Sequence, residues 1–164
     1  LSETRTFGQE VAVSVRFFSR LSLSGNYTYL NTKQYSEKVS YDGREVPGQP
    51  NDDLYLRLEY DANVFARKSS IYSEWNYTGT LFLDRGNLNE IPQRNLVSAG
   101  LQGELFSGTS LSFEMKNIFN RRVEWIALGR EVRPGISSLP RAVSDRLGYP
   151  LPGRTLYLSL RSNF

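Results

Sequence analysis

The feature that most constrains this chain is a two-residue alternation of apolar and polar side chains, which recurs in segments of about ten residues. Such alternation is typical of strands that have one apolar and one polar face. We count seven segments, at residues 7–18, 21–34, 54–60, 67–80, 95–105, 111–116 and 156–164. The sequence therefore predicts an all-β protein of about seven antiparallel, up-and-down strands.

The polar face of these segments carries charge on nearly every strand. The charged residues on it are Arg16, Arg57, Glu59, Glu74, Glu104, Glu114, Lys116 and Arg161. A charged face suits the water-filled lumen of a membrane barrel, and it equally suits the solvent face of a soluble sheet. Alternation alone leaves both classes open.

The connections between the segments alternate in length. Short turns lie at Ser19 and Arg20, at 61–66 and at 106–109, and long polar loops lie at 35–50, 81–94 and 121–153. Outer-membrane barrels have short periplasmic turns and longer extracellular loops. A soluble sandwich has no reason to sort its connections in this way. The loop pattern favours part of a transmembrane outer-membrane β-barrel with long extracellular loops.

Composition excludes several function classes. Cysteine and histidine are absent, which removes disulfides, the catalytic thiol, the commonest metal ligand and the usual general base. Asp52 and Asp53 are neighbours that alternate to opposite faces of a strand, so they form no acid and base pair. The net charge of +3 comes from scattered basic residues. We expect no enzyme, no metal or other cofactor, and no nucleic-acid partner.

The chain also has no run of about 18–20 apolar residues, which a membrane-spanning helix requires. It opens at Leu1 without a basic start, an apolar stretch or a cleavage site, so no signal peptide is evident. We interpret it as a piece of a longer precursor.

Three stretches carry a family resemblance. They are LSLSGNYTY at 21–29 followed by VPGQP at 46–50 and LYLRL at 54–58, LSFEMKNIFN at 111–120, and GYPLPGRTLYLSL at 148–160 before the terminal Phe164. In this order and spacing they resemble the last strands of TonB-dependent receptors, and the resemblance covers nearly the whole chain. Gly48 and Gly153 are expected to permit bends, and Asn117 and Asn120 to bond nearby backbone at a strand end.

The resemblance implies that residues 1–164 are the C-terminal part of a receptor barrel whose plug domain and N-terminal strands lie outside this chain. Family members are 22-stranded barrels closed by a plug. The parent would take up a scarce nutrient such as a ferric siderophore or cobalamin, energised by the TonB complex through the plug. An open sheet leaves two unpaired edges in hydrocarbon, so upstream strands or self-association must complete it.

The resemblance also implies sites and partners in the outer membrane of a Gram-negative cell. A final strand of alternating apolar residues and a terminal aromatic is the signal for the barrel assembly machinery, and Leu156, Leu158, Leu160 and Phe164 fit it. Ser162 departs from the pattern, since an aromatic is common there. Candidate substrate contacts in the outer loops are Tyr41, Arg44, Asp84, Arg85, Arg130 and Arg133. The arginines would attract an anionic chelate, and the alternatives are a solvated loop or a contact to lipopolysaccharide phosphates.

Two other interpretations remain. A small self-contained outer-membrane barrel, acting as an adhesin or structural protein, would need an eighth strand, for which residues 1–8 offer little. A soluble β-sandwich binding module is the other. It is distinguished by whether the face of Val11, Leu23, Leu56 and Leu158 packs on protein or on detergent.

Overall fold

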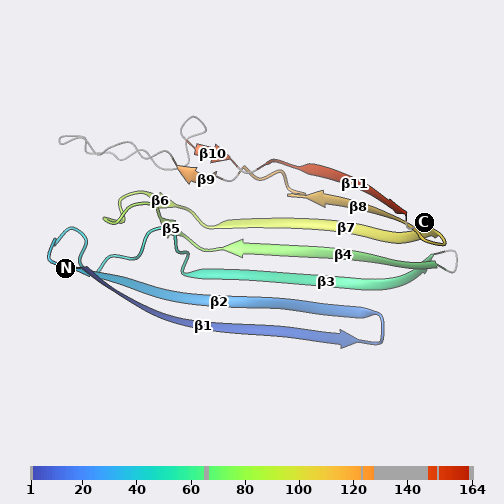
Figure 1. Ribbon diagram of the computed structural model, residues 1–164, viewed down its shortest axis with the longest axis horizontal. Helices are drawn as coiled ribbons and strands as arrows, with labels where there is room; N and C mark the ends of the chain where they lie inside the picture. Colours follow the sequence, from blue (N-terminus) through green and yellow to red (C-terminus); the bar gives the residue numbers. More distant parts are fainter. Residues whose placement is uncertain (1, 65–66, 123, 128–147, 151, 163–164) are drawn as a thin grey trace.

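The computed structural model describes residues 2–64, 67–122, 124–127, 148–150 and 152–162. Seven strands form one antiparallel sheet in the order β1-β2-β3-β4-β7-β8-β11 (Figure 1). They are β1 (Ser2–Phe17), β2 (Leu21–Ser36), β3 (Asp52–Val64), β4 (Arg67–Thr78), β7 (Arg94–Phe106), β8 (Thr109–Lys116) and β11 (Thr155–Ser162). The predicted all-β, up-and-down architecture is confirmed. In the described ranges no helix is long and apolar enough to cross a membrane.

The connections are sorted between the two ends of the sheet. The β1–β2 and β7–β8 turns lie at one end, and the long connections lie at the other (Figure 1). Two small hairpins belong to the long connections. One pairs β5 (Leu81–Phe82) with β6 (Glu90–Ile91), and the other pairs β9 (Glu124–Ala127) with β10 (Gly148–Pro150). The predicted asymmetry of loop lengths is therefore present in the structure.

The tight turns depend on positive backbone φ angles. At the β1–β2 turn, Phe18 and Ser19 have φ of 49° and 62°, and the Arg20 amide donates to the Phe17 carbonyl at 3.2 Å. Two consecutive left-handed residues match the right-handed twist of the strands that the turn joins. The turn is centred one residue earlier than the predicted Ser19 and Arg20. At the β7–β8 turn a glycine, Gly108, takes the left-handed position with φ of 77°.

Several predicted boundaries were wrong: β1 begins at Ser2 and not at residue 7, and β2 continues to Ser36, into the predicted loop. Residues 61–64, predicted as a connection, continue β3 and pair with residues 67–70 of β4. A hairpin ladder is held by main-chain hydrogen bonds, so it can continue where the apolar alternation stops. Residues 81–94, predicted as an irregular loop, contain β5, β6 and the first residue of β7. The small hairpin forms around Leu81 and Ile91, which are 8% and 2% exposed and pack with Leu83.

Cross-strand register separates the two faces of the sheet. One row of partners consists of Val15, Leu23, Leu58, Ser73, Ala99, Met115 and Leu156. The next row, one residue along, consists of Arg16, Ser22, Glu59, Tyr72, Gly100, Glu114 and Tyr157. Because successive side chains of a strand point to opposite faces, the first row belongs to an apolar face and the second to a polar face. We call these the outward face and the inward face.

The outward face has nothing packed on it among the described residues. Leu158, Leu160 and Ile71 are 73%, 66% and 58% exposed, and the buried hydrophobic residues Leu81 and Ile91 lie outside the large sheet. A soluble β domain buries such a face against a second layer, and burial of each large apolar side chain contributes about 1.5–3 kcal/mol. The sheet is therefore stable only with lipid or further protein on this face.

Candidate functional site

The long connections between β2 and β3 and between β4 and β7 fold together into an outer-loop unit, residues 37–51 and 79–93. Gln34 of β2 links its two halves and is 4% exposed. Its Nε2 donates to the Glu45 carbonyl at 2.7 Å and to the Arg85 carbonyl at 3.3 Å, and its Oε1 accepts from Arg85 Nε at 2.9 Å. Its backbone bonds to the first half through the Gly43 amide and the Arg44 carbonyl.

Asn87 provides a second link between the halves. Its Oδ1 accepts from the Glu45 amide at 2.6 Å, and its Nδ2 donates to the Glu45 carbonyl at 3.0 Å. Asn87 has φ of 54°, a conformation that asparagine tolerates better than most residues. The Gly48 amide, at the predicted bend, donates to the Phe82 carbonyl at 2.7 Å, with Gly48 φ at 75°. These contacts make the two loops one structural unit.

The outer-loop unit places two cations beside an aromatic ring. The Arg85 guanidinium carbon lies 5.1 Å from the centroid of the Tyr41 ring, and Lys38 Nζ lies 5.7 Å from it. Tyr41 is half-buried, whereas Arg85 and Lys38 are exposed. Cations held beside an aromatic face can receive an anionic or aromatic ligand. The structure thus brings together the sequence candidates Tyr41 and Arg85 and adds Lys38.

The other candidates differ in their contacts. Asp84 uses its carboxylate to accept the amides of Gly86, Leu88 and Asn89 at 2.6–3.1 Å, which shapes the β5–β6 turn. Arg44 is exposed, and its backbone carbonyl accepts from the Gln34 backbone amide. Arg130 and Arg133 lie outside the described residues. Sequence reasoning missed Gln34 and Asn87, because a polar residue in a strand or loop gives no sign of a partner 42 or 51 positions away.

A charged network occupies the middle of the inward face. Arg57 binds Glu59 through Nε at 3.0 Å and Nη2 at 2.9 Å, and binds Glu74 through Nη1 at 2.6 Å. The Tyr55 hydroxyl also donates to Glu74 at 2.9 Å. The Arg57 guanidinium stacks on the Tyr72 ring at 3.8 Å, and this ring covers Gly100 on the next strand, where a Cβ would come within 2.4 Å of it. Three of the charged residues predicted for this face, Arg57, Glu59 and Glu74, therefore pair with one another.

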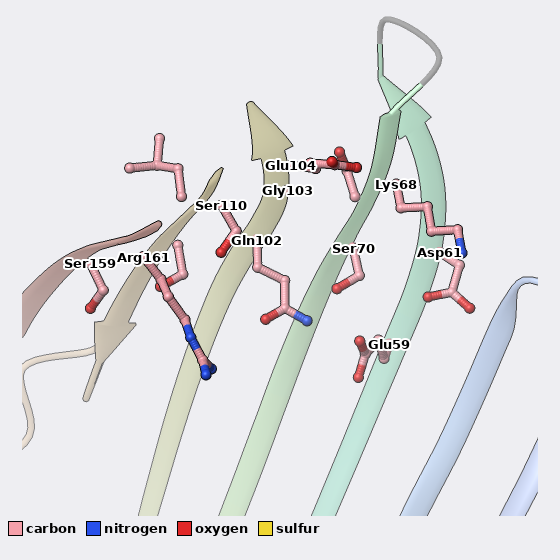
Figure 2. A pocket seen from close by; sticks show the side chains of 13 residues that line it. Glu59, Asp61, Lys68, Ser70, Gln102, Gly103, Glu104, Ser110, Ser159 and Arg161 are labelled. Atoms are coloured by element: carbon pink, nitrogen blue, oxygen red, sulfur yellow. The ribbon is translucent and has the colours of Figure 1, made fainter. Parts of the chain in front are cut away.

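A polar groove lies beside this network, towards the short turns. It encloses about 550 Å³ and is lined by residues of β3, β4, β7, β8 and β11, whose side chains are drawn in Figure 2. Register explains the hollow, because a row of mostly short side chains crosses the sheet between two rows that contain larger charged ones. The row is Asp61, Ser70, Gln102, Ser112 and Ser159. Ser70 Oγ is buried and has no hydrogen-bond partner among the described residues.

The second and third family-like motifs meet at the loop end of β8 and β11. Asn117, with φ of 49° and 5% exposed, donates to the carbonyls of Arg121 at 2.7 Å and Pro152 at 3.3 Å. Asn120 Oδ1 accepts from the Arg154 amide at 2.9 Å. The prediction that both asparagines bond nearby backbone is confirmed. Gly153 has no left-handed φ, and its role is to allow the close approach of Asn120 Oδ1, which would lie 2.8 Å from a Cβ at this position.

Of the predicted assembly signal, Leu156, Leu158 and Leu160 share the outward face and are 58%, 73% and 66% exposed. Phe164 lies outside the described residues. Asp52 and Asp53 point to opposite faces, as predicted. The Tyr27 hydroxyl bonds Asp52 on the outward face, and Thr78 Oγ1 bonds Asp53 at 3.0 Å on the inward face. Among the described residues no group of three or more acidic side chains is placed to hold a metal ion.

The fold is similar to that of solved receptor structures. The ferric yersiniabactin uptake receptor FyuA from Yersinia pestis matches 99% of this chain with a TM-score of 0.81 and 17% identity. The siderophore receptor PiuA from Acinetobacter baumannii matches 99% with a TM-score of 0.77 and 16% identity. The ferric preacinetobactin receptor BauA from the same organism matches 97% with a TM-score of 0.71 and 22% identity.

This chain spans 22–24% of the length of those three receptors. No family model matches it, and no curated protein matches it. The matched structures are receptors, in line with the expectation that this chain is not an enzyme. At these identities the similarity concerns the fold. The chain has the all-β fold of a quarter-length segment of these receptors, as its resemblance to TonB-dependent receptors predicted.

Proposed function

We propose that residues 1–164 form part of the barrel wall and two of the outer ligand-contacting loops of a TonB-dependent receptor that takes up a ferric siderophore. The observation that carries this proposal is the match of 97–99% of the chain to three siderophore receptors in one continuous sheet. The exposed outward face supports it, because hydrocarbon is the environment in which seven strands of exposed apolar side chains are stable.

The ligand-contacting part of the proposal rests on the outer-loop unit. Tyr41, Lys38 and Arg85 gather there, and Arg44 is exposed nearby on the same loop. Ferric chelates are commonly anionic and often carry aromatic rings, so cations beside a tyrosine suit them by charge and by stacking. Asp84 would act by shaping the turn, and Arg130 and Arg133 stay candidates of the third loop.

The remaining partners follow from the same proposal. The missing strands would pair with the two edge strands, β1 and β11, because hydrocarbon does not tolerate unpaired edges. The TonB complex would act through a plug outside this chain. Leu156, Leu158, Leu160 and Phe164 would present the signal for the barrel assembly machinery, and the whole receptor would lie in the outer membrane among lipid and lipopolysaccharide.

Growth under iron limitation tests the function. The gene for the complete protein is deleted, and growth is measured on a panel of single ferric chelates, each as the sole iron source. The proposal predicts loss of growth on one class of chelate and its return with the wild-type gene. Unchanged growth and unchanged uptake of radioactive iron across the whole panel would contradict siderophore uptake.

Variants of the complete receptor test the loop site. Tyr41→Ala and Arg85→Gln are compared with Lys68→Gln, which removes a charge on the inward face near the short turns. Because a cation beside an aromatic contributes about 0.5–2 kcal/mol, each loop variant should weaken chelate binding about 2- to 30-fold. Equal affinities for the loop variants and the control would remove the outer-loop unit from the ligand site.

The two alternatives fit the structure less well. A soluble sandwich needs a second sheet against the outward face, and the described residues supply none. A self-contained barrel would pair β1 with β11, but both are edges of the sheet.

A further inference from the structure

The part of the β1–β2 hairpin nearest the long loops carries a cationic pair on its outward face. Arg5 and Lys33 are direct cross-strand partners in a ladder without a register shift. The ladder places this pair on the outward face, next to the pair of Phe7 and Asn31. Val11 lies on the same face, further along the strand. One pleat, about 7 Å, separates Arg5 from Phe7 along the strand. The pair therefore stands at the border of the apolar surface.

The contacts of this pair leave positive charge exposed. Arg5 Nε binds Glu3 Oε1 at 2.9 Å, and these side chains are 69% and 62% exposed. The Arg5 guanidinium also lies 4.9 Å from the Tyr35 ring centroid, which orients it across the hairpin. Lys33 is exposed and has no anionic partner among the described residues. Like charges placed directly opposite each other destabilise a strand pair, unless an external anion lies between them.

The inward face of β2 next to Lys33 is covered by the outer-loop unit. Thr32 and Gln34, the neighbours of Lys33 on β2, are 3% and 4% exposed beneath the outer-loop unit. The cationic pair therefore faces away from the loop site, and a ligand held by Tyr41 and Arg85 does not reach it through the sheet. The partner that this geometry fits lies beside the barrel, in the surrounding lipid.

We propose that Arg5 and Lys33, with Tyr35 beside them, bind the phosphate of a lipid headgroup in the outer leaflet of the membrane. This inference rests on the proposed function, because it needs the sheet to be a membrane barrel with its long loops outside. A phosphate between the two cations accepts hydrogen bonds from the guanidinium and the ammonium and relieves their repulsion. The Tyr35 ring lies where aromatic side chains border the hydrocarbon.

The test uses the complete receptor purified in an uncharged detergent and titrated with lipid A, either bis-phosphorylated or dephosphorylated, with bound lipid counted by native mass spectrometry. Two double variants are compared with wild type. The double glutamine variant carries Arg5→Gln and Lys33→Gln, and the charge-keeping variant carries Arg5→Lys and Lys33→Arg. The control is Arg67→Gln, because Arg67 is an outward-face cation at the turn end of the sheet. A heat-modifiable band on gel electrophoresis verifies that each variant forms a barrel.

Each basic residue near an anionic lipid surface contributes about 1 kcal/mol, so the double glutamine variant should bind bis-phosphorylated lipid A about 30-fold more weakly than wild type. The charge-keeping variant and Arg67→Gln should bind bis-phosphorylated lipid A within about twofold of wild type. All of these proteins should bind dephosphorylated lipid A with the same affinity. Equal binding of bis-phosphorylated lipid A by wild type and the double glutamine variant would overturn the site. A protein that forms no heat-modifiable band at all would instead refute the proposed function.

Discussion

Replacing Gln34 with alanine should release the two halves of the outer-loop unit from each other. The Gln34 amide makes three hydrogen bonds, to the Glu45 carbonyl, the Arg85 carbonyl and Arg85 Nε, at 2.7, 3.3 and 2.9 Å. Hydrogen bonds contribute about 0.5–1.5 kcal/mol each. Because Gln34 is buried, we expect a total loss of about 2–4 kcal/mol, confined to the loops since the strand ladders remain intact.

Hydrogen exchange measured by mass spectrometry on the complete receptor is the assay. A loss of about 2–4 kcal/mol raises the opened population of the loops about 30- to 1000-fold. Exchange should accelerate in peptides that contain Gly43, Glu45 and Gly48, whose amides bond to Gln34, Asn87 and Phe82. Peptides from the middle of β3 should not change.

Gln49→Ala is the matched control, because Gln49 is a glutamine of the same unit whose side chain is exposed. It should leave exchange unchanged. If Gln34→Ala and Gln49→Ala give the same exchange rates in the loop peptides, the two loops are not held together by Gln34 and the reasoning fails.

The remaining predictions concern the sheet. Arg57→Gln leaves Glu59 and Glu74 without their cation and should destabilise the barrel by about 2–4 kcal/mol. The control Arg16→Gln should cost about 1 kcal/mol or less, because the ion pair of Arg16 with Asp61 is exposed. Equal urea midpoints for the two variants would contradict this prediction. Gly100→Ala drives a Cβ into the Tyr72 ring and should lower stability by about 1–3 kcal/mol, and an unchanged heat-modification temperature would show that the ring moves aside freely. Asn117→Ala should loosen the β8–β11 junction by about 1–3 kcal/mol, read as faster exchange in peptides around Arg121 and Arg154. Leu158→Lys should lower the stability of the barrel by about 2–4 kcal/mol if Leu158 faces lipid, whereas Ser159→Lys in the inward groove should lower it much less. The reverse order would mean that the assignment of the two faces is wrong.

The sequence was sufficient to predict the strands and the faces, because both depend on local side-chain alternation. Leu54, Leu56 and Leu58 lie on one face, as their spacing requires. The boundaries at 61–64 could not be predicted, since the β3–β4 ladder depends on main-chain pairing and not on the pattern of apolar residues. The β5–β6 hairpin escaped prediction for a related reason, because Leu81 and Ile91 become buried only once the chain has folded back.

The candidate site was only partly predictable. Tyr41 and Arg85 were selected because they are aromatic or basic residues in polar loops, but their proximity depends on how two loops pack across more than 40 positions of sequence. Gln34 and Asn87, which hold the loops together, look like ordinary polar residues. The cationic pair of Arg5 and Lys33 needs the β1–β2 register, which the sequence alone does not supply.

The outward face of the sheet should contact lipid and the inward face should contact water, and spin labelling tests this most directly. Residues 1–164 contain no cysteine, so single cysteines can be introduced and spin-labelled along β3 in the complete receptor, reconstituted in lipid. At positions 54, 56 and 58, we expect the spin labels to be highly accessible to oxygen and poorly accessible to a polar nickel chelate. At positions 55, 57 and 59, we expect either the opposite pattern or protection from both reagents. Oxygen accessibility without a two-residue period, or with its maxima at the charged positions, would contradict the assignment of the two faces.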